Sequence, residues 1–174
     1  MGQRRKAREC ALQILFELEF DNSDPEKTIR EYWQNKKASP EIKEYTDWLV
    51  QGIVAQQKKI DSLIQSSSEH WRMARMSLVD RNILRLAVFE FLEEKALALA
   101  IIIDEAIEIS KKYSDEKAAA FINGVLDAIR KKLGTKNNEL KEGKDVREKR
   151  ASKERKIKPK QGSQKDRPRD GPPG

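Results

Sequence analysis

The 174-residue sequence contains one cysteine, Cys10, and one histidine, His70. A single cysteine excludes an internal disulfide bond, and these two residues cannot supply the four ligands of a structural zinc site. No run of about 18 apolar residues is present, so no membrane-spanning helix is expected. The basic N-terminus also lacks the apolar segment of a signal peptide. We therefore expect a soluble, cytoplasmic protein without a metal or other cofactor.

Sequence signs of catalysis are missing as well. There is no Gly-rich loop that cradles phosphate, no nucleophile elbow and no metal-ligand spacing. His70 has no candidate nucleophile near it. Asp104, Glu105 and Glu108 fall on the polar side of a helical pattern, so we expect them to face solvent. The sequence therefore predicts no catalytic residues and a protein that is not an enzyme.

Excess charge of one sign is absent from most of the chain. Residues 1–133 contain 22 Lys and Arg residues and 22 Asp and Glu residues, and are formally neutral. The remaining 14 basic and 7 acidic residues lie in 134–174 and carry the whole net charge of +7. The high pI is therefore a property of the C-terminal segment.

Alternation of apolar and polar residues, typical of strands, is not found, and nearly every segment up to residue 133 has helical periodicity. The segments DPE (24–26) and SPE (39–41) are typical helix starts, because a capping side chain precedes a proline. Ser77, with Asp80 three residues later, predicts the start of a central helix over 78–94. We expect an all-α fold of six or seven helices.

The segment 134–174 contains few apolar residues and ends in RPRDGPPG. Such a segment cannot bury enough surface to offset the entropy lost on ordering. We therefore expect two parts, a helical domain over 1–133 and a disordered, Lys/Arg-rich tail over 134–174. Within the domain, 69–76 is expected to be a connection with Trp71 tucked beneath it.

Four cationic residues open the first predicted helix: Arg4, Arg5, Lys6 and Arg8. A helix N-terminus carries partial positive charge and favours acidic residues, so this placement is electrostatically unfavourable. Free N–H groups and guanidinium groups at a helix start bind phosphate well. The cluster is therefore either a solvated helix start or a site for a polyanion.

A second unusual segment is AFINGVLD, residues 120–127. Phe121 lies beside the predicted buried stripe, so it is either a packing residue or a stacking platform for an unpaired base. Gly124 inside a helix costs about 1 kcal/mol relative to Ala, and close packing or close approach of a ligand would explain it. Asn123 offers hydrogen bonds to a base edge, or caps a neighbouring loop.

Four segments in this order resemble the NusB family of bacterial transcription antitermination factors: RRKARECALQILFELE, SLVDRNILRLAVFEFL, IDEAIEISKKYSDEK and AFINGVLDAIRKKL. The resemblance covers residues 3–133 and implies two small helical bundles set across one another. It implies single-stranded boxA RNA and the ribosomal protein NusE as partners. These would act with other Nus factors in an RNA polymerase antitermination complex, chiefly in ribosomal RNA operons.

The resemblance also implies functional residues. The Arg-rich start of the family matches Arg4, Arg5, Lys6 and Arg8, and its aromatic-x-Asn-Gly motif matches Phe121, Asn123 and Gly124, all as RNA contacts. Its acidic position early in the central helix matches Asp80, which would face NusE, although the residues alone also allow Asp80 to cap its own helix. Family members often carry Lys before the aromatic residue, where this chain has Ala120.

The sequence leaves two other functions open. One is the helical RNA-binding module of a ribosomal RNA cytosine methyltransferase without its catalytic domain. The other is a protein-interaction bundle without RNA affinity. The sequence does not decide whether the free protein forms a homodimer.

Overall fold

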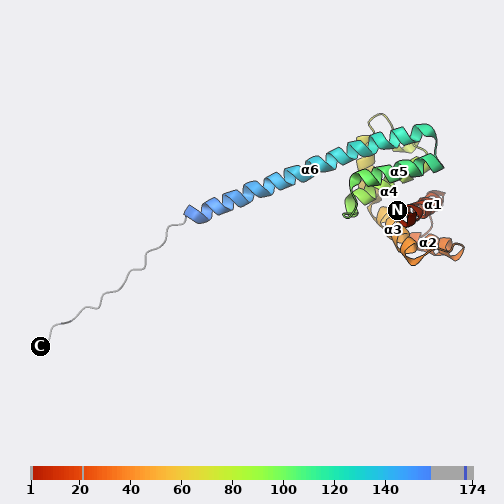
Figure 1. The fold of residues 1–174 in the computed structure, drawn as a ribbon, viewed down its shortest axis with the longest axis horizontal. Helices are drawn as coiled ribbons and strands as arrows, with labels where there is room; N and C mark the ends of the chain where they lie inside the picture. The colour runs from red at the N-terminus through yellow and green to blue at the C-terminus, as the bar shows by residue number, and fades with distance from the viewer. Residues whose placement is uncertain (1, 21, 158–170, 172–174) are drawn as a thin grey trace. The chain divides into compact units, whose positions relative to one another are not determined.

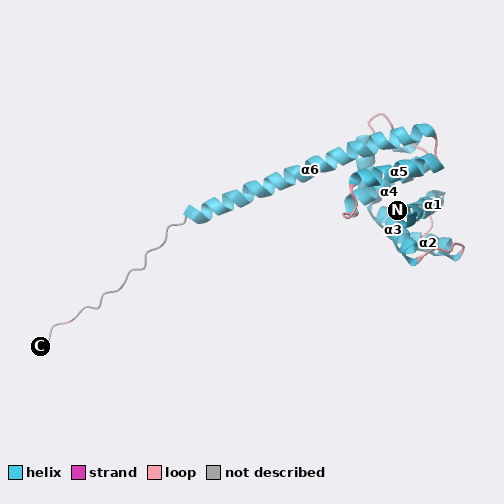
Figure 2. Ribbon diagram, viewed as in Figure 1, coloured by secondary structure: helices cyan, strands magenta, loops and turns pink. Residues whose placement is uncertain are grey.

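The computed structural model describes residues 2–20, 22–157 and 171, and within these it contains helices and loops but no strand (Figures 1 and 2). Beyond Thr135 it describes side chains only at 148, 149, 152 and 171. The elements are α1 (Gly2–Phe20), α2 (Pro25–Gln34), α3 (Pro40–Ser67), the 3₁₀ helix η1 (Met73–Arg75), α4 (Leu78–Glu93), α5 (Leu99–Tyr113) and α6 (Glu116–Ile157). The predicted all-α fold is confirmed.

The three predicted helix starts are confirmed by their caps. Asp24, Ser39 and Ser77 precede α2, α3 and α4, and each side chain accepts a hydrogen bond from a backbone N–H two or three residues later. Pro25 and Pro40 occupy the first helical turn, where the missing N–H is not needed. Local chemistry therefore sets where these helices begin.

The helices form two small groups around one contiguous core. Helices α1, α2 and α3 contact one another, and α4 contacts α5. The start of α6 lies along α5 in the ribbon (Figure 1). Contacts of α4 with both α1 and α3 join the two groups. Ile122, Val125, Leu126 and Ile129 bring α6 into the same core as α1, α3, α4 and α5.

Helices α3 and α4 pack closely at Gly52. A Cβ added to Gly52 would lie 2.0 Å from the ring of Phe89, whose side chain is fully buried. The Phe89 ring is also held by Trp48, at a centroid distance of 4.8 Å. Gly52 is therefore needed for this helix crossing.

The chain divides into two units, residues 1–134 and 135–174. The structure differs here from the predicted disordered tail, because the α6 backbone stays helical as far as Ile157. Between Pro40 and Pro159 the sequence has no proline that would interrupt a helix. The rest of the predicted tail, 158–170 and 172–174, lies outside the described residues.

Candidate nucleic-acid interface

The cationic cluster of α1 is tied to carboxylates of α4 and α5. Arg8 donates from Nε and Nη2 to Glu90 at 2.8–3.0 Å, and from Nη1 to Glu105 at 3.4 Å. The hydroxyl of Tyr45 donates to the same Glu90 carboxylate. Arg8 is only 2% exposed, and both carboxylates are similarly buried. The Arg8 guanidinium is therefore buried and already paired with two carboxylates, so the RNA contact predicted for Arg8 has no support from its exposure and stays a prediction.

Arg5 forms the second of these ion pairs. Its Nε and Nη2 donate to the two oxygens of Glu105 at 2.9 and 2.8 Å. These hydrogen bonds hold the pKa of Glu105 below its usual value. Glu105 is thus buried and charged, whereas the sequence analysis expected it to face solvent. The helical spacing indicates this burial, because Glu105 lies three residues after buried Ile102 and four before buried Ile109, on the same face of α5.

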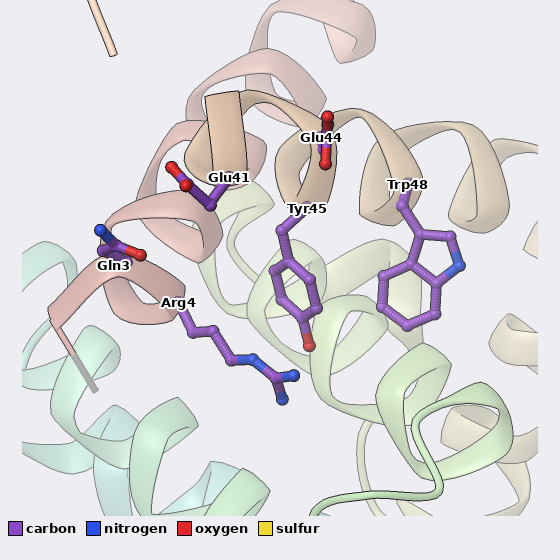
Figure 3. Close-up of a pocket in the computed structure, with 6 residues that line it drawn as sticks. All are labelled: Gln3, Arg4, Glu41, Glu44, Tyr45 and Trp48. Carbon is purple, nitrogen blue, oxygen red and sulfur yellow. The ribbon is translucent and has the colours of Figure 1, made fainter. Parts of the chain in front are cut away.

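Arg4 lies in acidic surroundings. Its guanidinium pairs with Glu94 at 3.3 Å and lies over the Tyr45 ring at 5.0 Å. Figure 3 shows Arg4 extending toward Tyr45, with Glu41 and Glu44 on the neighbouring α3. A hollow with more carboxylates than cations disfavours a phosphate group.

These contacts explain the unfavourable placement of cations at a helix start. Carboxylates of α4 and α5 offset the positive charge at the start of α1, so the placement of the cations does not require an external anion. Lys6 differs from the three arginines, since it is exposed and has no ion-pair partner among the described residues. Of the predicted cluster, Lys6 is the cation most available to RNA.

Phe121 meets the connection before α4. Its ring is partly buried against the core and makes an edge-to-face contact with Trp71, at a centroid distance of 6.0 Å and an interplanar angle of 69°. Trp71 is 56% exposed, so the prediction that it is tucked beneath the connection is wrong. The two rings form an aromatic surface that sequence reasoning missed.

Gly124 and Asn123 lie on the exposed face of α6. A Cβ added to Gly124 would meet no atom within 4 Å, so helix packing does not explain the glycine. The Asn123 amide has no hydrogen-bond partner among the described side chains and backbone groups, so it caps no neighbouring loop there. Both residues remain open to a ligand.

Exposed cations lie close in sequence to both rings of this aromatic surface. Arg72 and Arg75 are exposed in the connection that carries Trp71, and exposed Lys117 lies one helical turn before Phe121. Lys132 instead holds α6 in place, because it donates to Ser66 and Ser67 at the C-terminal end of α3. The surface around Phe121 therefore combines aromatic rings with exposed cations.

Asp80 does not cap its own helix, which is a correction to one sequence-based interpretation. The Ser77 hydroxyl takes that position and accepts from the Asp80 N–H at 3.0 Å. The Asp80 carboxylate accepts from the Ser114 hydroxyl at 2.7 Å, which links α4 to the junction of α5 and α6. The carboxylate is partly exposed, so it is open to a partner as well.

The predicted RNA-binding residues thus fall into two groups. Among the described residues, no hydrogen bond, ion pair or ring contact joins Arg4, Arg5, Lys6 and Arg8 to Phe121, Asn123 and Gly124. The second group, Phe121, Asn123 and Gly124, has the chemistry of a surface that binds single-stranded nucleic acid.

No cluster of three possible metal ligands occurs in the described part, and no described helix is both long and apolar enough to cross a membrane.

Comparison with known proteins places the chain in a family. Residues 5–131 match the sequence model of the NusB family. A transcription antitermination protein NusB of Sorangium cellulosum is 40% identical over 134 residues, which cover 77% of this chain and 96% of that protein. The NusB protein of Bdellovibrio bacteriovorus is 43% identical over 129 residues, covering 74% and 95%.

Solved structures agree with this match. NusB of T. maritima superimposes with a TM-score of 0.69 at 40% identity, covering 74% of this chain and 90% of that one. A crystal structure of antitermination factors NusB and NusE in complex with dsRNA gives a TM-score of 0.67 at 33% identity, covering 75% and 98%. The matches extend over most of the chain and almost the whole length of these relatives, so the chain belongs to the NusB family.

Proposed function

We propose that this protein is a transcription antitermination factor that binds single-stranded boxA RNA together with NusE. In this role it joins the other Nus factors on RNA polymerase and promotes read-through, chiefly in ribosomal RNA operons. Family membership supports the antitermination role, and a related NusB has been crystallised with NusE and RNA. Relatives matched almost end to end are named as antitermination proteins, which favours this role over a methyltransferase module.

The exposed face of α6 is the observation that carries the RNA-binding proposal. Successive helical residues are rotated by about 100°, so Phe121 and Asn123 project from opposite sides of this face, with Gly124 between them. An RNA strand crossing the helix at Gly124 would have a ring on one side and an amide on the other. The missing Cβ lets the strand approach the helix backbone, which gives a reason for a glycine that packing does not require.

The N-terminal residues have a smaller part in this proposal. Lys6 supplies the main phosphate contact. Arg4 and Arg5 are half-exposed, but a phosphate contact from either would compete with its ion pair to Glu94 or Glu105. Arg8 acts indirectly, because its buried ion pairs fix α1 against α4 and α5. This division follows the exposure of each guanidinium or ammonium group.

Asp80 is proposed to face NusE. Its carboxylate lies at the start of α4 and keeps acceptor capacity beyond its bond to Ser114. A basic side chain of NusE is the chemical partner that such a carboxylate would take. RNA-binding experiments with and without NusE test whether NusE is a partner of this protein and whether it contributes to RNA binding.

The first test is a gel shift with boxA RNA and a scrambled control of equal length, with and without NusE. The wild-type protein with NusE should prefer boxA RNA. Phe121→Ala should lower the affinity for boxA RNA by about 1–3 kcal/mol, since stacking of one base is lost. Lys59→Gln, an exposed change on α3, serves as the control and should bind normally.

Equal affinity for boxA and scrambled RNA would contradict the proposed function. Binding of NusE without any RNA affinity would instead identify a protein-interaction bundle. If Phe121→Ala binds boxA RNA normally but unfolds at a lower temperature, Phe121 is a packing residue.

A further inference from the structure

Trp71 is the least expected feature of the aromatic surface. The chain has three tryptophans, and this one is 56% exposed, whereas Trp33 and Trp48 are each held in part by neighbouring side chains. Its indole N–H has no hydrogen-bond partner among the described residues. Together with the neighbouring Phe121 ring, this exposed indole offers apolar surface whose burial under a ligand would be favourable.

The backbone around Trp71 is nevertheless firmly held. The Trp71 carbonyl accepts hydrogen bonds from Gln65 Nε2 and Ser68 Oγ, both at 3.2 Å. Its N–H donates to the Ser68 carbonyl at 3.0 Å, and Gln65 Oε1 accepts from the Met73 N–H at 3.0 Å. The connection is therefore fixed on both sides of Trp71 while the ring projects outward. A fixed ring binds with less loss of conformational entropy than a mobile one.

The Trp71 ring lies against the Phe121 ring. The edge-to-face contact sets the two rings at 69°, so the pair cannot be a closed stack and the Trp71 ring keeps a free surface. Exposed Arg72 follows directly in the chain, and exposed Lys117 lies one turn before Phe121 on α6. The site thus has an aromatic surface beside cations, which is the chemistry that holds unpaired nucleotides.

We propose that Trp71 and Phe121 together form a stacking site for an unpaired base of the bound RNA, with Arg72 contacting an adjacent phosphate. This proposal rests on the proposed function and adds a specific residue to it. The RNA would extend from the Gly124 crossing on α6 to the connection between α3 and α4. An unpaired base is the favoured ligand over a protein side chain, because the cations that flank the rings suit the phosphates on either side of a base.

The test compares Trp71→Leu with Trp71→Phe in boxA RNA binding in the presence of NusE. Leu removes the ring and should lower the affinity about 5- to 150-fold, the range for loss of one stacked base. Phe keeps a ring and should retain most of the affinity. Circular dichroism and thermal unfolding of both variants separate this effect from a loss of folding.

Two further measurements distinguish stacking from charge. The Trp71 ring carries no charge, so Trp71→Leu should leave the salt dependence unchanged, whereas Arg72→Gln should reduce its log–log slope by about 0.7. Lys59→Gln is the charge-matched control and should leave the slope as it is. RNA should also quench the fluorescence of the wild-type protein, and this quenching should be lost in Trp71→Phe, which keeps Trp33 and Trp48.

The outcomes separate this proposal from the function on which it rests. If the wild type binds boxA RNA selectively and Trp71→Leu binds it equally well, the stacking proposal is wrong and the function stands. Unchanged quenching in Trp71→Phe would contradict it in the same way. If the wild type does not distinguish boxA from scrambled RNA, both proposals are overturned.

Discussion

Arg8 and Lys6 lie two residues apart on α1 but in opposite surroundings. Arg8 is buried between Glu90 and Glu105, whereas Lys6 is exposed. Residues two apart on a helix face different directions, so one cation of a cluster is buried while another stays in solvent. The same sequence motif therefore contributes both to the stability of the fold and to the proposed contact with RNA.

Replacing Arg8 should affect stability before it affects RNA binding. Arg8→Ala leaves Glu90 without its cation in the core, which should reduce the free energy of unfolding by about 3–5 kcal/mol. Lys6→Gln should change it by less than about 0.5 kcal/mol and reduce the log–log salt slope of RNA binding by about 0.7. Urea unfolding and RNA titrations at several salt concentrations measure the two effects.

The opposite pattern would reverse the roles of these two cations. An Arg8→Ala variant with wild-type stability and a flatter salt slope would make Arg8 a phosphate contact. Lys59→Gln is again the control for removal of an exposed charge, because it lies on α3 with no described ion pair.

At the scale of helices, two glycines have contrasting reasons to be present. Gly52 faces the buried Phe89 ring where α3 crosses α4, while Gly124 faces open space on α6. Sequence alone marked Gly124 as unusual, because it interrupts a helical pattern. Gly52 also interrupts a helical pattern, but the reason for it is not visible in the local sequence, since the close approach of Phe89 comes from a helix about 40 residues away in the chain.

Alanine at these two glycines should have effects of opposite sign. Gly52→Ala should reduce the free energy of unfolding by about 1–3 kcal/mol, because its Cβ overlaps the Phe89 ring. Gly124→Ala should raise it by about 0.5–1 kcal/mol through helix propensity, while weakening boxA binding. Thermal unfolding and RNA titration of both variants provide the measurements.

A stabilised Gly124→Ala variant with unchanged RNA affinity would contradict the proposed crossing of RNA over α6. A Gly52→Ala variant with wild-type stability would mean that Phe89 and Trp48 repack around the added methyl group. The two glycines thus serve as controls for each other.

For the whole molecule, charge and fold are separated along the chain. The first unit ends at Gly134, and the net charge of +7 lies in 134–174. Basic segments add non-specific attraction to RNA without distinguishing one sequence from another. We therefore expect recognition in the first unit and only general attraction from the second.

Removal of the residues after Leu133 should lower the affinity for boxA and scrambled RNA by the same factor at low salt. The ratio of the two affinities should stay unchanged, because base contacts determine specificity and phosphate contacts do not. Gel shifts of the truncated and full-length chains at low and high salt measure this ratio. A lower ratio after truncation would place part of the recognition in the tail.

Several features of this protein follow from the sequence by itself. Helical periodicity, the caps at Asp24, Ser39 and Ser77, and the absence of strand patterns determine an all-α fold, because these are local effects of neighbouring residues. The unusual character of the Arg-rich start and of Gly124 is also local, since it comes from a conflict with the helix dipole or with helix propensity. Both segments belong to the sequence motifs that resemble the NusB family, so the family too can be predicted from local sequence.

Only the tertiary structure decided which unusual residues are buried and which remain free. Glu90 stands among apolar residues of α4, which signals a buried cation partner, but the identity of that partner as Arg8 depends on how α1 packs on α4. The contact of Trp71 with Phe121 likewise joins residues 50 apart in the chain, and no local pattern indicates it. Burial and ion pairing are set by elements distant in sequence, so local patterns indicate that a partner is needed without identifying it.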